Sequence, residues 1–293
     1  RVAVNRIWQM AFGTGLVKTT EDFGAQGDWP SHPELLDWLA VDFMDSGWNV
    51  KRLWKTILMS ETYRQSSRVT DALREKDPEN RLLARGPRFR MPAEMLRDQA
   101  LAVSGLLVEK RGGPPVKPYQ PAGLWSENGG ADYKRDTGEG LYRRSVYTFW
   151  RRTSPPPFMA AFDSALRESC TVREGRTNTP LQALHLMNDE QFVEAARVLA
   201  ERVIREAGPD AGQRMRRTFA RVLAREPRET EMATMRQMLA YAMDRYRSKP
   251  QDAEALLRMG DSPRDKSIDA AEHAAWATIA SLVLNLDATV TKE

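Results

Sequence analysis

The chain has 293 residues, of which 41% are hydrophobic and 29% are charged, close to the average for globular proteins. This composition, with a single cysteine, excludes disordered, collagen-like and disulfide-stapled classes. The net charge of +4 is too small to indicate a polyanionic partner unless it is concentrated in one place. The longest apolar run, residues 274–284, is shorter than the roughly 18 residues of a membrane helix, so we expect no membrane span.

Residues 1–110 are predicted to form helices joined by short connections. The sequence Ser31-His32-Pro33-Glu34 combines a capping box with a proline at the first helical position, and a helix is expected to begin there. Apolar residues recur at helical spacing again from Val50 to Leu58, after the break at Gly47-Trp48. This pattern predicts a helical hairpin. A third helix is predicted over residues 93–108.

Residues 111–178 are predicted to hold a loop, one strand and an arginine-rich segment. Seven glycines and four prolines within residues 112–141 favour a long loop. Alternating side chains from Tyr142 to Arg152 predict a strand, which the prolines at 155–157 end.

Residues 179–293 are predicted to be helical again. Thr179-Pro180-Leu181-Gln182 is a capping box with proline at the first helical position. Residues 192–204 form the clearest amphipathic helix, and further helices are expected around residues 215–223, 232–243 and 279–286. The expected fold is mainly α: an irregular helical domain of helical hairpins, with one small β element and a long Gly/Pro/aromatic loop.

The arginine-rich segment, residues 143–176, holds seven arginines and three acidic residues, a local excess of four. It leads into the helix at Pro180, whose free amide groups and dipole favour an anion such as sulfate, carboxylate or phosphate. The alternative is that its arginines pair with the three acids and hold the loop in place. We favour this pairing, in which Arg167, Arg173 and Arg176 meet Asp163, Glu168 and Glu174.

The candidate binding residues come from this segment and from the loop before it. They are Arg143, Arg152, Arg167, Arg173, Arg176, Asn178, Trp125 and Tyr119. Exposed aromatic rings on a loop stack on sugar rings or nucleobases. The low net charge and the lack of a recognised nucleic-acid module argue against nucleic acid as a partner.

Paired carboxylates could support a glycosidase, either Asp163 with Glu168 or Asp22 with Asp28. In a chain with 40 acidic residues such pairs arise by chance, so we favour a non-catalytic protein. A hydrolase acting on an anionic polysaccharide through the carboxylates near Asp163 is the alternative.

No metal or cofactor is expected in this chain. Its three histidines lack the spacing of a zinc site, and one cysteine cannot attach haem. Cys170 is expected to be a small buried residue; the alternative is a nucleophile activated by neighbouring arginines.

The segment R-E-S-C-T-V-R-E-G-R-T-N-T-P-L-Q-A-L at 167–184, followed by Met187-Asn188-Asp189, carries a family resemblance. It closely resembles the planctomycete-specific domain of unknown function that forms the C-terminal part of large planctomycete proteins. Similar signatures run across the chain: N-R-I-W-Q-M-A-F-G-T-G-L-V from Asn5, D-F-G from Asp22, H-P-E-L-L-D-W-L-A from His32, Y-R-Q-S-S from Tyr63, P-Y-Q-P-A-G-L-W from Pro118, Y-R-R-S-V-Y-T-F-W-R-R from Tyr142, and L-N-L-D near the C-terminus.

The resemblance implies a domain normally preceded by a second planctomycete-specific domain and often by a cytochrome c domain, in an exported, extracytoplasmic protein. Haem would then belong only to that separate domain. We expect residues 1–293 to be one family domain from a longer chain, with blocks at 1–110, 111–178 and 179–293. The expected function is a non-catalytic binding or assembly module. Its expected partners are other domains of the polypeptide, including the cytochrome c domain, and an anionic polysaccharide.

Overall fold

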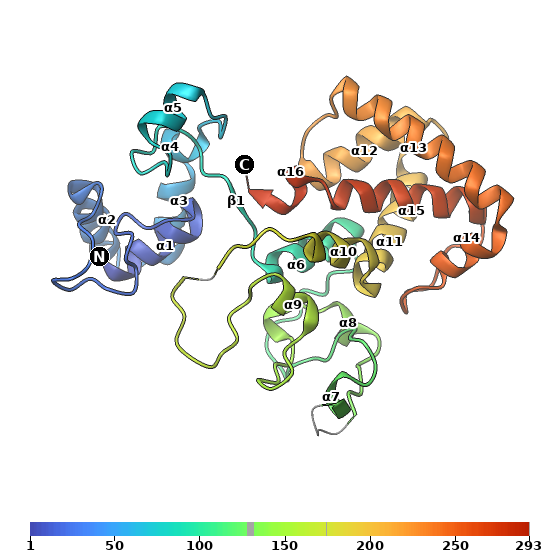
Figure 1. The fold of residues 1–293 in the computed structure, drawn as a ribbon, viewed down its shortest axis with the longest axis horizontal. Helices are drawn as coiled ribbons and strands as arrows, with labels where there is room; N and C mark the ends of the chain where they lie inside the picture. Colours follow the sequence, from blue (N-terminus) through green and yellow to red (C-terminus); the bar gives the residue numbers. More distant parts are fainter. Residues whose placement is uncertain (128–131, 174, 293) are drawn as a thin grey trace. The chain divides into compact units, whose positions relative to one another are not determined.

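The computed structural model describes residues 1–127, 132–173 and 175–292, and the chain divides into two compact units. Unit 1 comprises Arg1–Arg90, Cys170–Arg173 and Thr291–Glu293, and unit 2 comprises Met91–Ser169 and Glu174–Val290. The described residues form sixteen α-helices and one two-stranded antiparallel sheet (Figure 1). The predicted mainly α fold with one small β element is therefore confirmed.

Unit 1 is built from short helices around an aromatic core. Its elements are α1 (Val2–Phe12), α2 (Pro33–Asp45), α3 (Val50–Leu58), α4 (Glu61–Arg64), α5 (Asp71–Lys76), and the paired strands β1 (Phe89–Arg90) and β2 (Thr291–Lys292). The ring of Trp8 stacks on that of Phe12 with centroids 4.2 Å apart, beside the buried Leu39 and Leu53. The predicted hairpin of α2 and α3 is confirmed, although His32 rather than Ser31 is the N-cap of α2.

Unit 2 is centred on α11. Its elements are α6 (Ala93–Ser104), α7 (Leu124–Glu127), α8 (Glu139–Tyr142), the 3-10 turn η1 (Ser145–Tyr147), α9 (Pro157–Ala161), α10 (Pro180–Asn188), α11 (Glu190–Ala207), α12 (Ala211–Leu223), α13 (Glu229–Ser248), α14 (Pro250–Leu257), α15 (Ala270–Leu284) and α16 (Asp287–Val290). α15 packs against both α11 and α13 (Figure 1). Leu199, Phe219 and Trp276 lie at the centre of this core, each no more than 3% exposed.

Helix starts in unit 2 follow the sequence signals. α10 begins at Pro180, and the Gln182 side chain accepts a hydrogen bond from the Thr179 amide at 3.3 Å, as the capping box predicts. α11 begins after Asp189, whose carboxylate accepts from the Gln191 amide at 3.1 Å. These caps satisfy amide groups that have no partner inside the helix.

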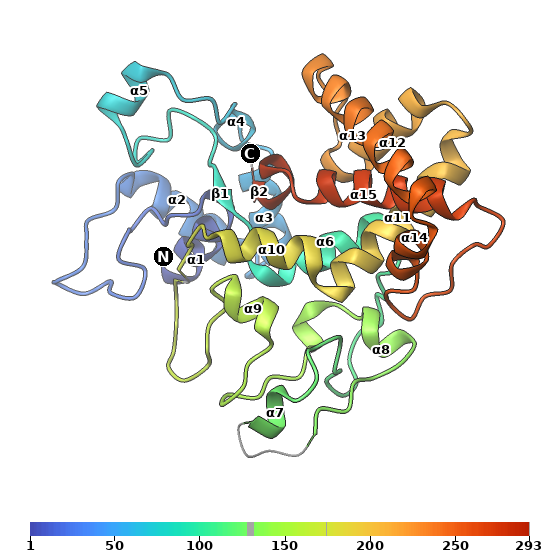
Figure 2. The ribbon, with the colours of Figure 1, turned by 45° about the vertical axis from the view of Figure 1, so that its right-hand side comes forward.

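A long irregular segment connects α6 to α9, and the part of it that the structure describes carries only short helical turns (Figure 2). Arg97, 1% exposed, anchors this segment to α6 by donating to the carbonyl oxygens of Leu141 at 2.6 Å and Arg143 at 2.8 Å. Its Nε donates to the Gln191 side chain of α11 at 2.5 Å. One guanidinium thus joins α6, the segment and α11.

Two local predictions in this region are wrong. The third helix ends at Ser104 rather than residue 108, because Gly105 adopts a left-handed φ of 90° that terminates it. The strand predicted over residues 142–152 does not form: Val108–Arg143 and Val116–Thr148 make only isolated bridges. The amide of Ser145 donates to Asp98 instead of a neighbouring strand, and η1 follows.

Among the described residues, no helix is both long enough and apolar enough to cross a membrane.

Lys292 fastens β2 to the core of unit 1. Its ammonium lies 3.8 Å from the ring centroid of Tyr63 and donates to the Ala11 carbonyl oxygen at 2.7 Å. Partial burial lowers the pKa of Lys292 to about 8, below the ordinary value of 10.5.

This lowered pKa predicts a pH dependence of stability. Between about pH 8 and 10.5 the unfolded chain binds more protons at Lys292 than the folded chain does, so the free energy of unfolding should increase as pH rises through this window. The half-exposed side chain limits the effect to about 1 kcal/mol or less. Urea unfolding of wild type and Lys292→Met at pH 7 and pH 10 measures it. A stability difference between the two proteins that is equal at both pH values contradicts the prediction.

Candidate functional site

A row of polar side chains along α11 is buried rather than exposed. The row consists of Gln191, Glu194, Arg197 and Glu201, which are 6%, 0%, 0% and 9% exposed. Their spacing of three or four residues places them on one face of the helix. Charged groups removed from water need hydrogen-bonded partners. Here the partners come from α6, from the irregular segment and from the loop between α14 and α15.

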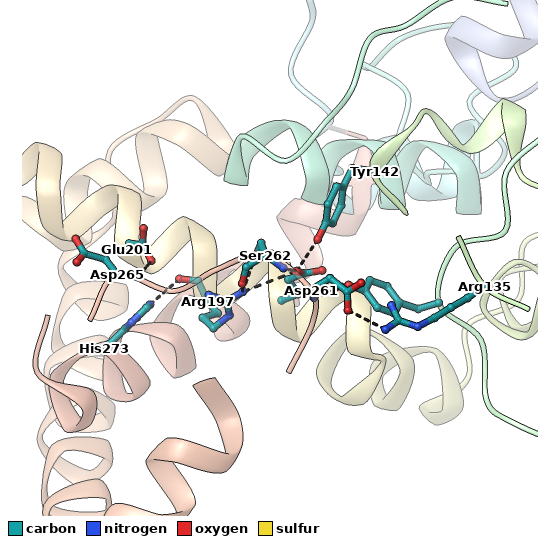
Figure 3. A network of polar contacts seen from close by, with 10 residues as sticks. Arg135, Tyr142, Arg197, Glu201, Asp261, Ser262, Asp265 and His273 are labelled. Atoms are coloured by element: carbon teal, nitrogen blue, oxygen red, sulfur yellow. Dashed lines mark hydrogen bonds and ion pairs between the residues drawn. The ribbon is translucent and has the colours of Figure 1, made fainter. Parts of the chain in front are cut away.

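Glu194 is the centre of this network. Its Oε1 accepts from the Tyr142 hydroxyl at 2.8 Å and from the Ser262 amide at 2.7 Å. Arg197 lies 3.8 Å from the same oxygen and donates to the Ser262 carbonyl oxygen at 2.6 Å. Figure 3 shows these contacts running from His273 at one end to Arg135 at the other.

Three further contacts hold the loop and the start of α15. Glu201 accepts from the Asp265 amide at 2.9 Å, and Asp265 pairs with Arg205 at 2.6 Å. The His273 Nε2 lies 3.0 Å from the Arg197 carbonyl oxygen, so this nitrogen carries the ring proton. Burial lowers the pKa of His273, which favours the neutral imidazole.

The network is not fully satisfied internally. Within the described part of the chain, Glu194 Oε2, two guanidinium nitrogens of Arg197 and His273 Nδ1 are buried without a hydrogen-bond partner. Each such group costs about 1–3 kcal/mol. Burial therefore lowers the pKa of Arg197, although the nearby carboxylates oppose this shift.

Asp261, which follows Gly260 in the same loop as Ser262, connects this network to Tyr119 and to the partly exposed Arg135. Its amide donates to the Tyr119 hydroxyl at 2.8 Å, and its carboxylate pairs with Arg135 at 2.8 Å. The Arg135 guanidinium lies 5.2 Å from the Tyr119 ring centroid. Two side chains from the irregular segment are thus held by one residue of the distant loop.

Tyr119 and Arg135 line a cleft of about 550 Å³, which we name the tyrosine cleft. Its other walls are residues 120–122, Tyr133 and residues 188–190, where α10 ends and α11 begins. The Tyr133 hydroxyl donates to the Pro118 carbonyl oxygen at 2.7 Å. Burial raises the pKa of both tyrosines, so both are neutral phenols at physiological pH.

The polar groups of the tyrosine cleft carry more negative than positive charge. Arg135 is already paired with Asp261, whereas Asp189 and Glu190 add two carboxylates. Burial raises the pKa of Asp189, which also caps α11. Aromatic walls, an amide at Asn188 and carboxylate acceptors suit a ligand with many hydroxyl groups better than an anion.

Arg143 does not supply the cationic surface that the sequence led us to expect. Its side chain is 5% exposed and donates to the carbonyl oxygens of Lys110, Gly112 and Pro114. Its guanidinium also lies 3.9 Å from the Tyr147 ring centroid. Because its guanidinium is buried and donates to backbone carbonyl oxygens, Arg143 is not available to a ligand.

The aromatic residues of the loop are also less accessible than expected. Trp125 is 8% exposed and Tyr119 is 7% exposed, so the prediction of two exposed stacking rings is wrong. Trp125 packs edge-on against Tyr133, with centroids 4.9 Å apart. The aromatic residues give this loop a small core of its own, and only the Tyr119 and Tyr133 side chains line the cleft.

The candidate catalytic carboxylates both have protein partners. Asp163 accepts from the Thr177 amide at 2.7 Å and from its hydroxyl at 3.0 Å. Glu168 pairs with Arg152 at 3.2 Å, and both side chains are exposed. These contacts favour a structural role over acid–base chemistry.

Four other predicted binding residues are exposed and do not line the tyrosine cleft: Arg167, Arg173, Arg176 and Asn178. Arg167 stacks over Trp150, with its guanidinium 4.6 Å from the ring centroid. Arg173 belongs to unit 1, whereas Arg176 and Asn178 belong to unit 2, and all three are exposed. Of the acids expected to pair with these arginines, Glu174 lies outside the described residues. Cys170 is exposed, so the prediction that it is buried is wrong.

Tyr119 was predicted from the sequence, whereas Arg135, Asp189, Glu190 and the buried row of α11 were not. Two sequence motifs could have pointed to them: P-Y-Q-P-A-G-L-W from Pro118 and Met187-Asn188-Asp189. Both border the tyrosine cleft. No group of three or more His, Cys, Asp or Glu side chains in the described residues is arranged to hold a metal ion.

Comparison with protein-family models matches residues 1–239 to the family described as PSD1, protein of unknown function (DUF1553). The matched residues include the tyrosine cleft and all of α11. No curated protein and no solved structure matches the chain. Ser262 and His273 lie beyond the matched residues, yet both belong to the network, so the folded unit extends past the match.

Gly260 tests how strictly Glu194 is held. Its φ is +85°, and an added Cβ would lie within 3.0 Å of the Glu194 side chain, which two hydrogen bonds keep in place. Gly260→Ala is therefore expected to lower the free energy of unfolding by about 2–4 kcal/mol. Gly112→Ala is the matched control, because φ is +72° there with nothing within 4 Å, and about 1–2 kcal/mol of strain is expected. Equal losses in urea unfolding would show that Glu194 imposes no constraint.

Proposed function

We propose that the chain, which belongs to the PSD1 family of proteins of unknown function, is a non-catalytic binding module that holds a neutral glycan in the tyrosine cleft. The proposal rests on one observation: hydrogen bonds and an ion pair hold the residues of the cleft wall in fixed positions. Tyr119 and Arg135 are both held by Asp261, and the neighbouring Ser262 is held by the buried Glu194. A wall held in this way loses little conformational entropy when a ligand binds.

The chemistry of the cleft favours a sugar over a charged polymer. Hydroxyl groups donate to carboxylates such as Glu190, and the apolar face of a sugar ring packs on the half-buried ring of Tyr133. A sulfate or uronate would meet Asp189 and Glu190, while the one cleft arginine already has a partner. We therefore replace the anionic polysaccharide expected from the arginine-rich segment by a neutral glycan.

A binding role is favoured over hydrolysis because the candidate carboxylates already have partners within the protein. Glycoside hydrolysis needs one carboxyl group as acid and a second as base or nucleophile across the scissile bond. Asp163 and Glu168 are engaged with Thr177 and Arg152, and Asp189 caps α11. The wider setting of the proposal, an exported planctomycete protein with a cytochrome c domain, rests on the sequence resemblance alone.

Glu190→Ala tests the proposal with a close control. Glu190 is the first residue of α11, is exposed, and lines the cleft; Glu229 is the exposed first residue of α13 and does not line it. Both substitutions remove the same favourable charge at a helix N-terminus, about 0.3–1 kcal/mol of stability. We expect only Glu190→Ala to weaken glycan binding, by about tenfold, which is about 1.4 kcal/mol.

Affinity electrophoresis and calorimetry against neutral, sulfated and uronate polysaccharides provide the measurement. Retention on neutral polymers that changes little with salt supports the proposal, because no ion pair is screened. Retention on anionic polymers alone, falling steeply with salt, refutes the neutral ligand. Release of reducing ends that Asp189→Asn abolishes would refute the non-catalytic role.

A further inference from the structure

Trp29 in unit 1 has the highest exposure of any large apolar side chain among the described residues, at 90%. Burying an aromatic side chain is favourable, so leaving an indole in water forgoes stabilisation that the fold would otherwise gain. Trp29 borders a pocket of about 320 Å³ formed by its own loop, with Val17 and Leu36 behind it. We name this the Trp29 pocket.

The loop that carries Trp29 is held by internal hydrogen bonds. The Thr19 hydroxyl donates to the Asp22 carbonyl oxygen at 2.9 Å and accepts from the Asp28 amide at 2.8 Å. The Asp22 carboxylate accepts from the Gly24 amide at 2.7 Å. A Cβ at Gly27 would lie within 3.0 Å of the Asp22 carbonyl oxygen, so this turn requires glycine. The indole is therefore presented on an ordered loop.

The other walls of the pocket combine an apolar base with a polar rim. Phe23 and Pro30 extend the apolar surface beside Trp29. Asp28 is exposed and also lines the pocket, and within the described residues no side chain forms a hydrogen bond or ion pair with its carboxylate. Arg1 also borders the pocket, but it pairs with Asp37 at 2.5 Å. The available polar group is thus a carboxylate, an acceptor for hydroxyl groups.

We infer that the Trp29 pocket is a second carbohydrate site, in which one sugar ring stacks on the Trp29 indole and donates hydroxyl hydrogens to Asp28. A volume of about 320 Å³ lies at the lower end of the range for ligand sites, which suits one or two sugar rings. The carboxylate selects a neutral sugar over a uronate or sulfated one. The inference stands on unit 1 alone and does not depend on the tyrosine cleft.

The test uses the full chain carrying Glu190→Ala, so that binding at the tyrosine cleft is weakened in every sample. The probes are neutral gluco-, manno- and galacto-oligosaccharides of four to six residues, followed by calorimetry and by the change in tryptophan fluorescence. Adding Trp29→Ala should lower the affinity at least tenfold, whereas Trp29→Tyr should retain part of it. Asp28→Asn should weaken binding by several-fold.

Trp38→Ala is the control, because Trp38 is 58% exposed on α2 and does not border the pocket. It should change the affinity less than twofold. Equal affinity in the Trp29→Ala and parent proteins overturns the second site and leaves the tyrosine cleft unaffected. Absence of binding of every probe to the Glu190→Ala parent, with its unfolding midpoint unchanged, also overturns it.

Discussion

Burying the Glu194 carboxylate costs several kcal/mol unless its oxygens are hydrogen-bonded, and the donors that it takes determine where two loops lie. One donor is the Tyr142 hydroxyl, at the end of α8, and the other is the Ser262 amide, between α14 and α15. These residues are 52 and 68 positions away from Glu194 in the chain. Gly260 allows the loop to approach closely, because no side chain separates it from Glu194. A single charged group on the central helix thus brings two distant irregular segments together.

An apolar row on α11 would achieve similar burial with fewer unsatisfied groups, since well-packed apolar residues often replace buried ion pairs without loss of stability. Hydrogen bonds differ from apolar contacts in being directional, and the direction matters at the cleft. Asp261 donates to Tyr119 through its amide and binds Arg135 through its carboxylate, so its backbone position sets both wall residues. The polar row is therefore better explained by the geometry it imposes than by the stability it adds.

The helices that apolar spacing and capping motifs indicate could be predicted from the sequence. The buried polar contacts of α11 could not. Helical spacing of apolar residues identified α11, and the Thr179–Gln182 pattern located the start of α10. The same spacing leaves Glu194 and Arg197 on the opposite face, which local patterns assign to water. Their burial depends on loops tens of residues away, and periodicity carries no information about such pairing. The alternation at residues 142–152 misled for the same reason, because the described residues offer it only isolated bridges and no neighbouring strand.

Arginine content illustrates why a charge excess is a weak guide to a ligand. Arg97, Arg143, Arg197 and Arg214 are each no more than 8% exposed, and each donates to backbone carbonyl oxygens of irregular segments. Such segments have carbonyl groups that no helix or sheet satisfies, and a guanidinium with five N–H donors reaches several of them at once. Burial lowers the pKa of Arg97 to about 10, yet its side chain is still charged at neutral pH. Arg97 and Arg143 therefore reflect the irregular backbone that they hold, and the charge of a ligand has to be inferred from the groups that line the tyrosine cleft.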